Sequence, residues 1–334
     1  MTLRIGMVGA GWIGQLHATR WRRLPVNLVG FYDTNADAAR HAASVYGGQS
    51  FSSIERLMHA VDVVHVCTPT VYHKEYVLEA AAQRKHVLCE KPLARHLADA
   101  QEMIAACEKS GIRLFAGHVL RFFPQYAHAR HLVQQGAVGR PGMVRLLRAA
   151  GHPAVSEARA WFKSVDNTGG CMLEGGVHDL DFARWAIGEV DHVFARGLTY
   201  RRDLAILGDH ALATLRFTNG AIGHVEQSWM VTDGRFRQQF EIAGDQGMLS
   251  YDSLPPEQFA IALRAEIRPA LLPSEPLSPG DEPYYRQLEH VVDCLLRDRE
   301  FAVSPQDGLE ALRLSLAVLE SMRTGKMVKV QGVV

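Results

Sequence analysis

The chain lacks the cysteine patterns that define a disulfide-bonded scaffold. It has 5 cysteines, an odd number, and none stands in a Cys-x-x-Cys pair. They are Cys67, Cys89, Cys107, Cys171 and Cys294. This usage predicts free thiols in a reducing compartment and argues against a disulfide framework.

The sequence also lacks an excess of charge and a long apolar run. Lys+Arg and Asp+Glu both number 36, so no overall field favours nucleic acid or an anionic membrane. No apolar stretch approaches the ~20 residues that span a bilayer, and no basic leader with an apolar segment and cleavage site begins the chain. These absences predict a cytoplasmic protein whose partners include neither nucleic acid nor membrane.

Length and composition bound the architecture. A chain of 334 residues exceeds one typical hydrophobic core and predicts two domains. Apolar residues make up 47% and charged residues 22% of the chain, as in soluble globular proteins. We therefore expect two folded domains, each with its own core.

A glycine-rich turn follows the first predicted strand, residues 3–8, and opens a helix that runs to about Arg23. The turn reads Gly9-Ala10-Gly11-Trp12-Ile13-Gly14. Gly9 allows the tight turn, Gly11 lets the backbone approach a pyrophosphate, and Gly14 lets helix and strand pack closely. The helix N-terminus adds unpaired N–H groups and a positive dipole end, so this segment predicts dinucleotide binding.

Asp33 is the acidic residue that a dinucleotide-binding turn of this kind requires at the end of the next strand. It ends the next predicted strand, residues 28–32, and stands nineteen positions past Gly14 (33 − 14). A carboxylate there binds the adenosine ribose hydroxyls and repels a 2′-phosphate. Thr34 and Asn35 follow, with no arginine or lysine beside them to bind that phosphate. NAD is therefore favoured over NADP.

The alternation of strands and helices continues to residue 122. Further strands are predicted at 49–51, 61–67, 87–89 and 112–117, and helices near 73–83 and 97–110. Six strands interleaved with helices predict a doubly wound parallel sheet, so residues 1–122 form an α/β Rossmann domain.

Lys91 stands at the exit of the fifth predicted strand, in the sequence Glu90-Lys91-Pro92. Proline disfavours helical geometry at the preceding residue, so Lys91 should be extended at the strand's end. In a parallel sheet that end is the carboxyl edge, where open α/β sheets bind ligands. A lysine there could move protons, although for Lys-Pro taken alone an ordinary loop lysine is the better interpretation.

Residues 123–334 show a different pattern. Strands dominate from Val190 to Tyr251, and Asn219-Gly220 predicts a hairpin between runs at 211–218 and 221–229. Helices are predicted at 124–135, in a run ending at 187, at 284–297 and at 304–324, and a long surface loop at 254–281. These features predict an α+β domain with a large, mostly antiparallel sheet.

A second group of chemical side chains lies within 168–181. Glu174, His178 and Asp181 fall at i, i+4 and i+7, one face of a helix, while the glycines at 175 and 176 suggest that something approaches the backbone. Three interpretations remain open: a surface ion pair, a metal site and an acid–base pair. The metal site ranks low because a His-Glu-x-x-His pattern and a cysteine cluster are both missing.

Together these motifs resemble the Gfo/Idh/MocA oxidoreductases, the family of glucose–fructose oxidoreductase and inositol dehydrogenase. The resemblance covers almost the whole chain. Beyond the glycine-rich turn, it rests on Thr68-Pro69 with His73, on Lys85–Leu93, on Arg121–Pro124, on Gly169–Asp181 and on Gly244–Gly247.

The resemblance implies an NAD(P)-dependent oxidoreductase that transfers a hydride between nicotinamide and a secondary alcohol of a sugar, polyol or related substrate. In this family the lysine of Glu-Lys-Pro is catalytic, often beside a cis peptide. The histidine matching His178 is the acid–base residue. We expect His178 to take the hydroxyl proton, Lys91 to stabilise the same oxygen, and Glu174 to orient or tune the pair. The family's sheet often packs against another copy, which implies a homodimer or homotetramer.

The resemblance also suggests which residues bind the ligands. Expected cofactor contacts are Gly9, Gly11, Trp12, Ile13, Gly14, Asp33, Thr68, Pro69, His73, Glu90 and Lys91. Expected substrate contacts are Lys91, His118, Arg121, Trp161, Glu174 and His178. For Glu90 the alternative is a role in shaping the turn; for His118, Arg121 and Trp161 it is packing or surface pairing.

The sequence departs from the family pattern at two positions. Glu174 stands where the family usually has aspartate, so the site differs by one methylene. Phe162 follows Trp161 where some relatives have an arginine, which removes a polar contact. Two other functions remain open: a nicotinamide-binding regulatory protein without turnover, and an NAD-dependent glycosidase that uses transient oxidation.

Overall fold

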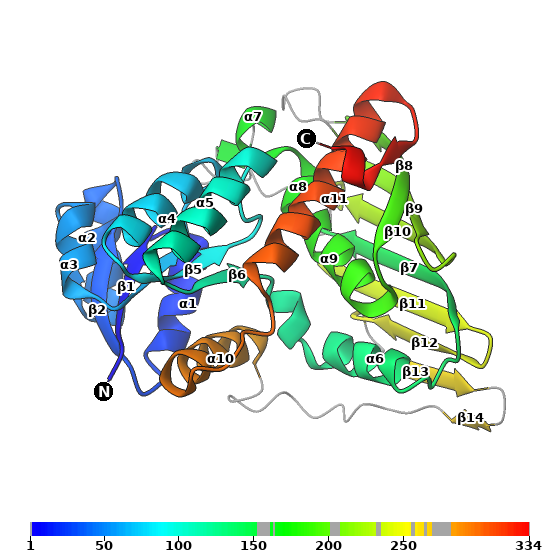
Figure 1. The fold of residues 1–334 in the computed structure, drawn as a ribbon, viewed down its shortest axis with the longest axis horizontal. Helices are drawn as coiled ribbons and strands as arrows, with labels where there is room; N and C mark the ends of the chain where they lie inside the picture. Colours follow the sequence, from blue (N-terminus) through cyan, green and yellow to red (C-terminus); the bar gives the residue numbers. More distant parts are fainter. Residues whose placement is uncertain are drawn as a thin grey trace. The chain divides into compact units, whose positions relative to one another are not determined.

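The computed structural model describes residues 2–151, 161–162, 164–200, 208–231, 235–254, 258–263, 266–268 and 282–333 (Figure 1). The chain forms two compact units. Unit 1 comprises Met1–Phe122 with Leu277–Leu309, and unit 2 comprises Phe123–Pro276 with Glu310–Val334. Sequence analysis predicted a second domain over all of 123–334, whereas residues 277–309 group with unit 1 in the structure.

Unit 1 contains a six-stranded parallel sheet. Its strands are β1 (Arg4–Val8), β2 (Asn27–Tyr32), β3 (Gln49–Ser50), β4 (Val63–Val66), β5 (His86–Glu90) and β6 (Leu114–Gly117). Their order is β3-β2-β1-β4-β5-β6, and every pairing is parallel. This is the doubly wound order that reverses direction between β1 and β4, so the prediction of a Rossmann sheet is confirmed.

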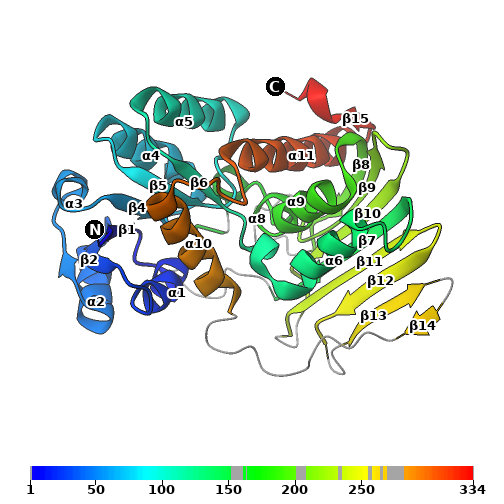
Figure 2. The same cartoon turned by 60° about the horizontal axis from the view of Figure 1, so that its bottom comes forward.

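Helices cover both faces of this sheet. They are α1 (Trp12–Trp21), α2 (Ala36–Tyr46), α3 (Ile54–Ala60), α4 (His73–Ala82), α5 (Leu97–Ser110) and α10 (Pro283–Arg297). Figures 1 and 2 show α4 and α5 on one face, and α1 and α10 on the other. Sequence reading missed α2, which Asn35 caps by accepting hydrogen bonds from the N–H groups of Asp37 and Ala38.

The core of unit 1 explains why α10 belongs to it. Leu288, Val291 and Cys294 of α10 are buried in the same apolar cluster as Trp21 of α1 and Phe115 of β6. One face of α10 therefore completes a core that the first 122 residues leave unfinished.

Unit 2 contains a nine-stranded sheet. Its strands are β7 (Pro141–Ala149), β8 (Val190–Leu198), β9 (His210–Phe217), β10 (Ile222–Ser228), β11 (Arg237–Gly244), β12 (Gly247–Asp252), β13 (Gln258–Leu263), β14 (Glu266–Arg268) and β15 (Val328–Lys329). They are ordered β14-β13-β12-β11-β7-β10-β9-β8-β15. Only β7 and β10 pair in parallel among these described strands, so the mostly antiparallel sheet is confirmed.

Two details of this sheet bear on the sequence predictions. The hairpin at Asn219-Gly220 joins β9 to β10, and Gly220 adopts a φ of +89°, which favours glycine. The predicted surface loop at 254–281 was partly wrong, because β13 and β14 lie within it. Residues 255–257, 264–265 and 269–281 lie outside the described residues.

The helices of unit 2 are α6 (Pro124–Gln134), α7 (Val165–Thr168), α8 (Cys171–Glu174), α9 (Gly176–Ile187) and most of α11 (Pro305–Thr324). Figure 2 shows α6, α8, α9 and α11 on one face of the sheet. Tyr126, Phe182 and Phe240 form a buried aromatic cluster between α6, α9 and β11. No helix within the described ranges is long and apolar enough to cross a membrane.

Candidate active site

The glycine-rich turn has the geometry that a dinucleotide requires. A Cβ on Gly9, whose φ is +96°, would lie 2.7 Å from the carbonyl of Cys67. A Cβ on Gly14 would lie 2.1 Å from the carbonyl oxygen of Gly9. Beside Gly11, the residue that precedes α1, no atom lies within 4 Å of where a Cβ would stand. Two glycines thus close the turn, and the third leaves open space before the helix N-terminus.

Asp33 is held beside this turn. Its carboxylate accepts hydrogen bonds from the N–H of Ala10 at 2.7 Å and from the N–H of Asn35 at 2.8 Å. These contacts fix the carboxylate where β2 ends, next to the loop after β1. Trp12 begins α1 and is 61% exposed.

The exits of β4 and β5 carry the next predicted cofactor contacts. The Thr68 hydroxyl is buried with no hydrogen-bond partner among the described residues. The open glycine and this unsatisfied hydroxyl are on the same carboxyl edge as Asp33, and together they fit a bound dinucleotide. Pro69 follows at the start of a short 3₁₀ turn over Thr70–Tyr72.

His73 is fully buried between the two strand exits. Its Nδ1 lies 3.0 Å from the carbonyl oxygen of Pro92, and its Nε2 lies 3.0 Å from that of Thr68. Burial lowers the pKa of this imidazole. His73 therefore joins the segment after β4 to the segment after β5.

Lys91 follows directly after β5, and the Lys91–Pro92 peptide is cis. The Glu90 carboxylate accepts a hydrogen bond from the Lys91 N–H at 3.2 Å, and its other oxygen lies 2.7 Å from His17 Nε2. Burial acts to raise the pKa of Glu90, but the hydrogen bond from His17 and the charges of His17 and Lys91 bring it below its ordinary value.

The predicted helix face of Glu174 and His178 is divided between two helices. α8 ends at Glu174, and α9 begins at Gly176, with Gly175 between them. Glu174 is 6% exposed, so the interpretation as a surface ion pair is wrong for this carboxylate. Leu173, Val177 and Leu180 are fully buried and anchor both helices in the core of unit 2.

Something does approach the two glycines. A Cβ on Gly175 would lie 2.6 Å from the Nε2 atom of Gln227 on β10, and one on Gly176 would lie 3.1 Å from the sulfur of Met172. Gln227 is 1% exposed, and its amide oxygen has no hydrogen-bond partner among the described residues. Gly175 therefore lets a buried amide reach the junction of α8 and α9.

One buried ion pair near His178 escaped sequence analysis. Arg148 on β7 donates to both carboxylate oxygens of Asp179, at 2.7 and 3.1 Å. Asp179 is fully buried, and burial raises its pKa although Arg148 acts to lower it. The detectable signal was an arginine on the inward alternation of β7, in phase with Val144 and Leu146.

The remaining residues predicted to contact substrate are His118, Arg121 and Trp161, and their environments differ. His118 is fully buried. Arg121, 6% exposed, pairs with Asp307 at 3.1 Å and donates to the Ala302 carbonyl oxygen at 3.1 Å, so it has a structural role within unit 1. The Trp161 ring lies 3.9 Å from that of Phe162, centroid to centroid.

Each unit thus assembles half of the predicted site. Unit 1 brings the glycine-rich turn, Asp33, Thr68, Glu90 and Lys91 to the carboxyl edge of one sheet. Unit 2 holds Glu174, His178 and the fully buried Asp181 on α8 and α9. The meeting of Lys91 with His178 stays a prediction.

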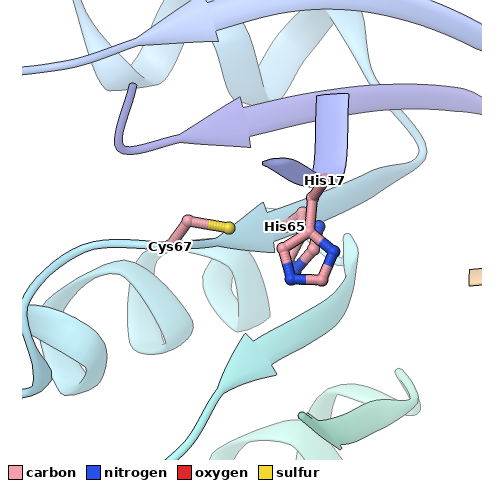
Figure 3. A group of neighbouring side chains, drawn as sticks. All are labelled: His17, His65 and Cys67. Atoms are coloured by element: carbon pink, nitrogen blue, oxygen red, sulfur yellow. The ribbon is translucent and has the colours of Figure 1, made fainter. Parts of the chain in front are cut away.

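One group of three potential metal ligands occurs among the described residues. His17 on α1, His65 on β4 and Cys67 after β4 are all buried, with ligand atoms within 4.8 Å of one another. Figure 3 shows the two imidazole rings beside each other and the Cys67 sulfur pointing toward them.

Two family profiles match the chain. Residues 3–118 match an oxidoreductase family with an NAD-binding Rossmann fold, and residues 126–250 match the GFO/IDH/MocA C-terminal domain. The chain belongs to the Gfo/Idh/MocA oxidoreductase family. It is therefore an NAD-dependent oxidoreductase, and the sequence predictions of family and cofactor are confirmed.

Two relatives of similar length align with almost the whole of this chain. It is 29% identical to myo-inositol 2-dehydrogenase of Thermotoga maritima, over 99% of this chain and 100% of the relative. It is 28% identical to 1,5-anhydro-D-fructose reductase of Ensifer adhaerens, over 98% of both chains.

Solved structures agree with this relationship. A probable dehydrogenase from Thermotoga maritima superposes with a TM-score of 0.85 at 29% identity, covering 99% of this chain and 100% of that one. The WlbA dehydrogenase of Bordetella pertussis, in complex with NADH and UDP-GlcNAcA, has a TM-score of 0.87 at 25% identity, covering 98% and 97%.

Proposed function

We propose that this protein transfers a hydride between NAD and a secondary alcohol carbon of a sugar or polyol. The observation that carries the proposal is the place of Lys91, directly after β5, on the sheet edge that also holds the glycine-rich turn and Asp33. The inositol dehydrogenase and anhydrofructose reductase among its relatives support a polyhydroxylated substrate.

The cofactor would be held by backbone and carboxylate groups of unit 1. The N–H groups at the start of α1, beside Gly11 and Ile13, suit the pyrophosphate, and the Asp33 carboxylate suits the adenosine ribose. Thr68, Pro69 and Glu90 would line the nicotinamide side. NAD, when bound, accepts or supplies the hydride at its nicotinamide ring. His73, being fully buried, would act by shaping this edge.

The proton chemistry would fall to residues of both units. Lys91 would donate a hydrogen bond to the reacting oxygen and stabilise its developing negative charge. His178 would take the hydroxyl proton during oxidation and return it during reduction. Glu174 would orient the imidazole or tune its charge, and its longer arm replaces the family's usual aspartate.

The other residues proposed to bind substrate differ in whether their side chains are already engaged elsewhere. Trp161 and His118 stay candidates for lining the substrate pocket. Arg121 is a weaker candidate, because its guanidinium is committed to Asp307 and to a backbone carbonyl. Specificity would then arise largely from unit 2, where Phe162 offers an apolar surface in place of a family arginine.

A screen of sugars and polyols tests this function. Purified protein is mixed with NAD or NADP and each alcohol, and reduced nicotinamide is followed by its absorbance. We expect NADH to accumulate with at least one polyhydroxylated substrate. An NAD-dependent glycosidase would instead cleave a glycoside with no net NADH, and a regulatory protein would bind NAD without turnover.

We further propose that the protein is a cytoplasmic homo-oligomer. The sheet face that bears no helix within the described ranges carries exposed apolar side chains, namely Phe194, Leu198, Leu212, Ile222 and Met248. A second copy of this chain is the occupant that such a face suits. The five cysteines are all free and buried, which supports a reducing compartment. Light scattering should give a dimer or tetramer, and Leu212→Glu should lower that mass.

A further inference from the structure

Glu90 is a buried carboxylate with one strong partner inside unit 1. The residue lies in the interior at the end of β5, 6% exposed, and His17 on α1 is fully buried beside it. Their atoms approach to 2.7 Å, Glu90 Oε1 to His17 Nε2. An ionised carboxylate accepts hydrogen bonds, so this contact requires a proton on Nε2 of His17 and leaves Nδ1 as the second nitrogen.

A second buried histidine lies behind the first. The rings of His17 and His65 are 4.3 Å apart, centroid to centroid, at 60°. The indole N–H of Trp21 donates to Nδ1 of His65 at 3.1 Å. Because an indole can only donate, Nδ1 of His65 must carry a lone pair. Burial lowers the pKa of His65 well below its ordinary value, so the ring is neutral and its proton is on Nε2.

The two rings are therefore left with complementary atoms. Nε2 of His65 is a buried donor, and Nδ1 of His17, when that ring is neutral, is a buried acceptor; neither has a hydrogen-bond partner among the described residues. This ordering of protons runs from Trp21 through His65 and His17 to Glu90.

A metal ion fits these atoms less well. A metal at His65 would need the lone pair of Nε2 while Nδ1 accepts from Trp21, which demands an imidazolate. Burial, with Glu90 and Cys89 nearby, raises the pKa of the Cys67 thiol well above its ordinary value, so the thiolate that metals prefer is disfavoured. The hydrogen bonds explain this cluster better than a metal does.

Glu90 connects the cluster to Lys91. Its second oxygen accepts from the Lys91 N–H at 3.2 Å, while His73 lies within hydrogen-bond distance of the Pro92 carbonyl oxygen at 3.0 Å on the other side. The backbone of Lys91 is thus held between two buried histidines, each reached through one neighbouring residue.

We propose that Trp21, His65 and His17 are positioning residues, a buried chain of contacting rings that holds Glu90 ionised and oriented so that Lys91 is placed to stabilise the reacting oxygen. The inference rests on the proposed function, because it assigns Lys91 a role in the reaction. None of the three side chains needs to touch substrate or cofactor.

Two substitutions of His17 separate this role from simple packing. His17→Leu keeps the volume but removes the donor to Glu90, whereas His17→Gln places an amide N–H near the former Nε2 position. We expect His17→Leu to lower kcat at least tenfold with NAD affinity within about threefold of wild type, and His17→Gln to recover most of that loss. His86→Leu is the matched control, a histidine at the opposite end of β5. It should keep wild-type kcat.

The pH profile gives a second readout. The titratable groups that face Glu90 come from three segments: His17 from α1, Cys89 and Lys91 from its own segment, and Cys67 and His73 from the segment after β4. His17 is faced in turn by His65 and by Tyr284 of α10. Without His17, burial should raise the pKa of Glu90, so kcat of His17→Leu should fall at a higher pH than wild type as the medium is acidified. Identical kcat and profiles in wild type and His17→Leu would overturn the proposal.

The wild-type protein provides a test that needs neither turnover nor a variant. Nitrogen-15 NMR of the imidazoles should show His17 protonated at Nε2 and His65 as the neutral Nε2–H form. A neutral His17 protonated at Nδ1 alone, or one equivalent of tightly bound zinc by elemental analysis, would contradict the chain. If no substrate is oxidised but NMR shows the expected protonation of both imidazoles, the proposed function fails while the arrangement of Trp21, His65, His17 and Glu90 is supported.

Discussion

Arg148 and Asp179 form a bidentate ion pair inside unit 2, and Asp179 is the residue immediately after His178. Both side chains are buried, Asp179 completely. The pair joins α9 to β7, so it fixes the turn of helix from which His178 projects. Removing one partner would leave the other charge buried without compensation.

We therefore expect Arg148→Met to lower the free energy of unfolding by about 3–5 kcal/mol. The double variant Arg148→Met with Asp179→Leu should recover much of this loss, because no charge remains buried. Urea denaturation followed by circular dichroism measures both, with exposed Arg145→Met on the same strand as control. Equal stability of wild type and Arg148→Met would show that the pair contributes nothing.

Lys91 and His178 should affect chemistry more than cofactor binding. We expect Lys91→Met and His178→Ala each to lower kcat by about 10²–10⁴-fold, the range typical of general acid–base groups, while the Kd for NAD changes little. Stopped-flow turnover and fluorescence titration of NADH give the two quantities. Wild-type-like turnover in both variants would exclude the proposed mechanism.

Asp33 should determine the choice of nucleotide. Asp33→Ser removes the carboxylate that repels a 2′-phosphate, so the ratio of kcat/KM for NAD to that for NADP should fall by about tenfold or more. Asp37→Ser, on the exposed start of α2, changes the same net charge and should leave the ratio unaltered. An unchanged ratio in Asp33→Ser would mean that other groups select the cofactor.

Gly175 should accept a side chain only if the Gln227 amide moves. In Gly175→Ala the new methyl would stand 2.6 Å from the Gln227 amide, so unfolding should become easier by about 1–3 kcal/mol. Gly332→Ala, where nothing lies within 4 Å, is the matched control. Adding Gln227→Ala should relieve the clash, and thermal melting compares the variants.

Glu90 should make stability depend on acidity. Its folded pKa is lowered, so its stabilising contribution is present above the unfolded pKa of about 4.3 and is lost as pH falls through the folded value. In Glu90→Gln this part of the pH dependence should disappear. Unfolding free energies of the NAD-free protein between pH 3 and pH 7 test it, and parallel curves for both proteins would refute it.

The fold of unit 1 was predicted well because its sequence signals lie among residues that are close together in the chain. The spacing from Gly9 to Asp33 follows from the geometry of one strand, one turn and one helix, and Lys91 was located by the proline after it. α2 was missed although Asn35 is a good cap and Ala39 and Ala42 give the helix a buried apolar face. Glycine at 175 was seen, but Gln227, fifty-two positions later (227 − 175), could be placed only by the pairing of β10.

Non-local contacts account for what sequence analysis missed in unit 2. The parallel pairing of β7 with β10 joins Met143 to Ile222, and no short-range pattern encodes it. The break between Glu174 and His178 depends on what packs against Gly175. Arg148 could be recognised as buried from alternation, but its partner on α9 emerges only when helix and sheet are assembled.

The late position of α10 has a consequence for biosynthesis. Residues 123–282 must be translated between the end of the first segment of unit 1 and the helix whose Leu288 and Val291 complete its core. At about 5–20 residues per second, this interval lasts roughly 8–32 s on the ribosome. During that time the NAD-binding segment has an uncovered apolar face, so nascent chains should depend on chaperones until α10 emerges.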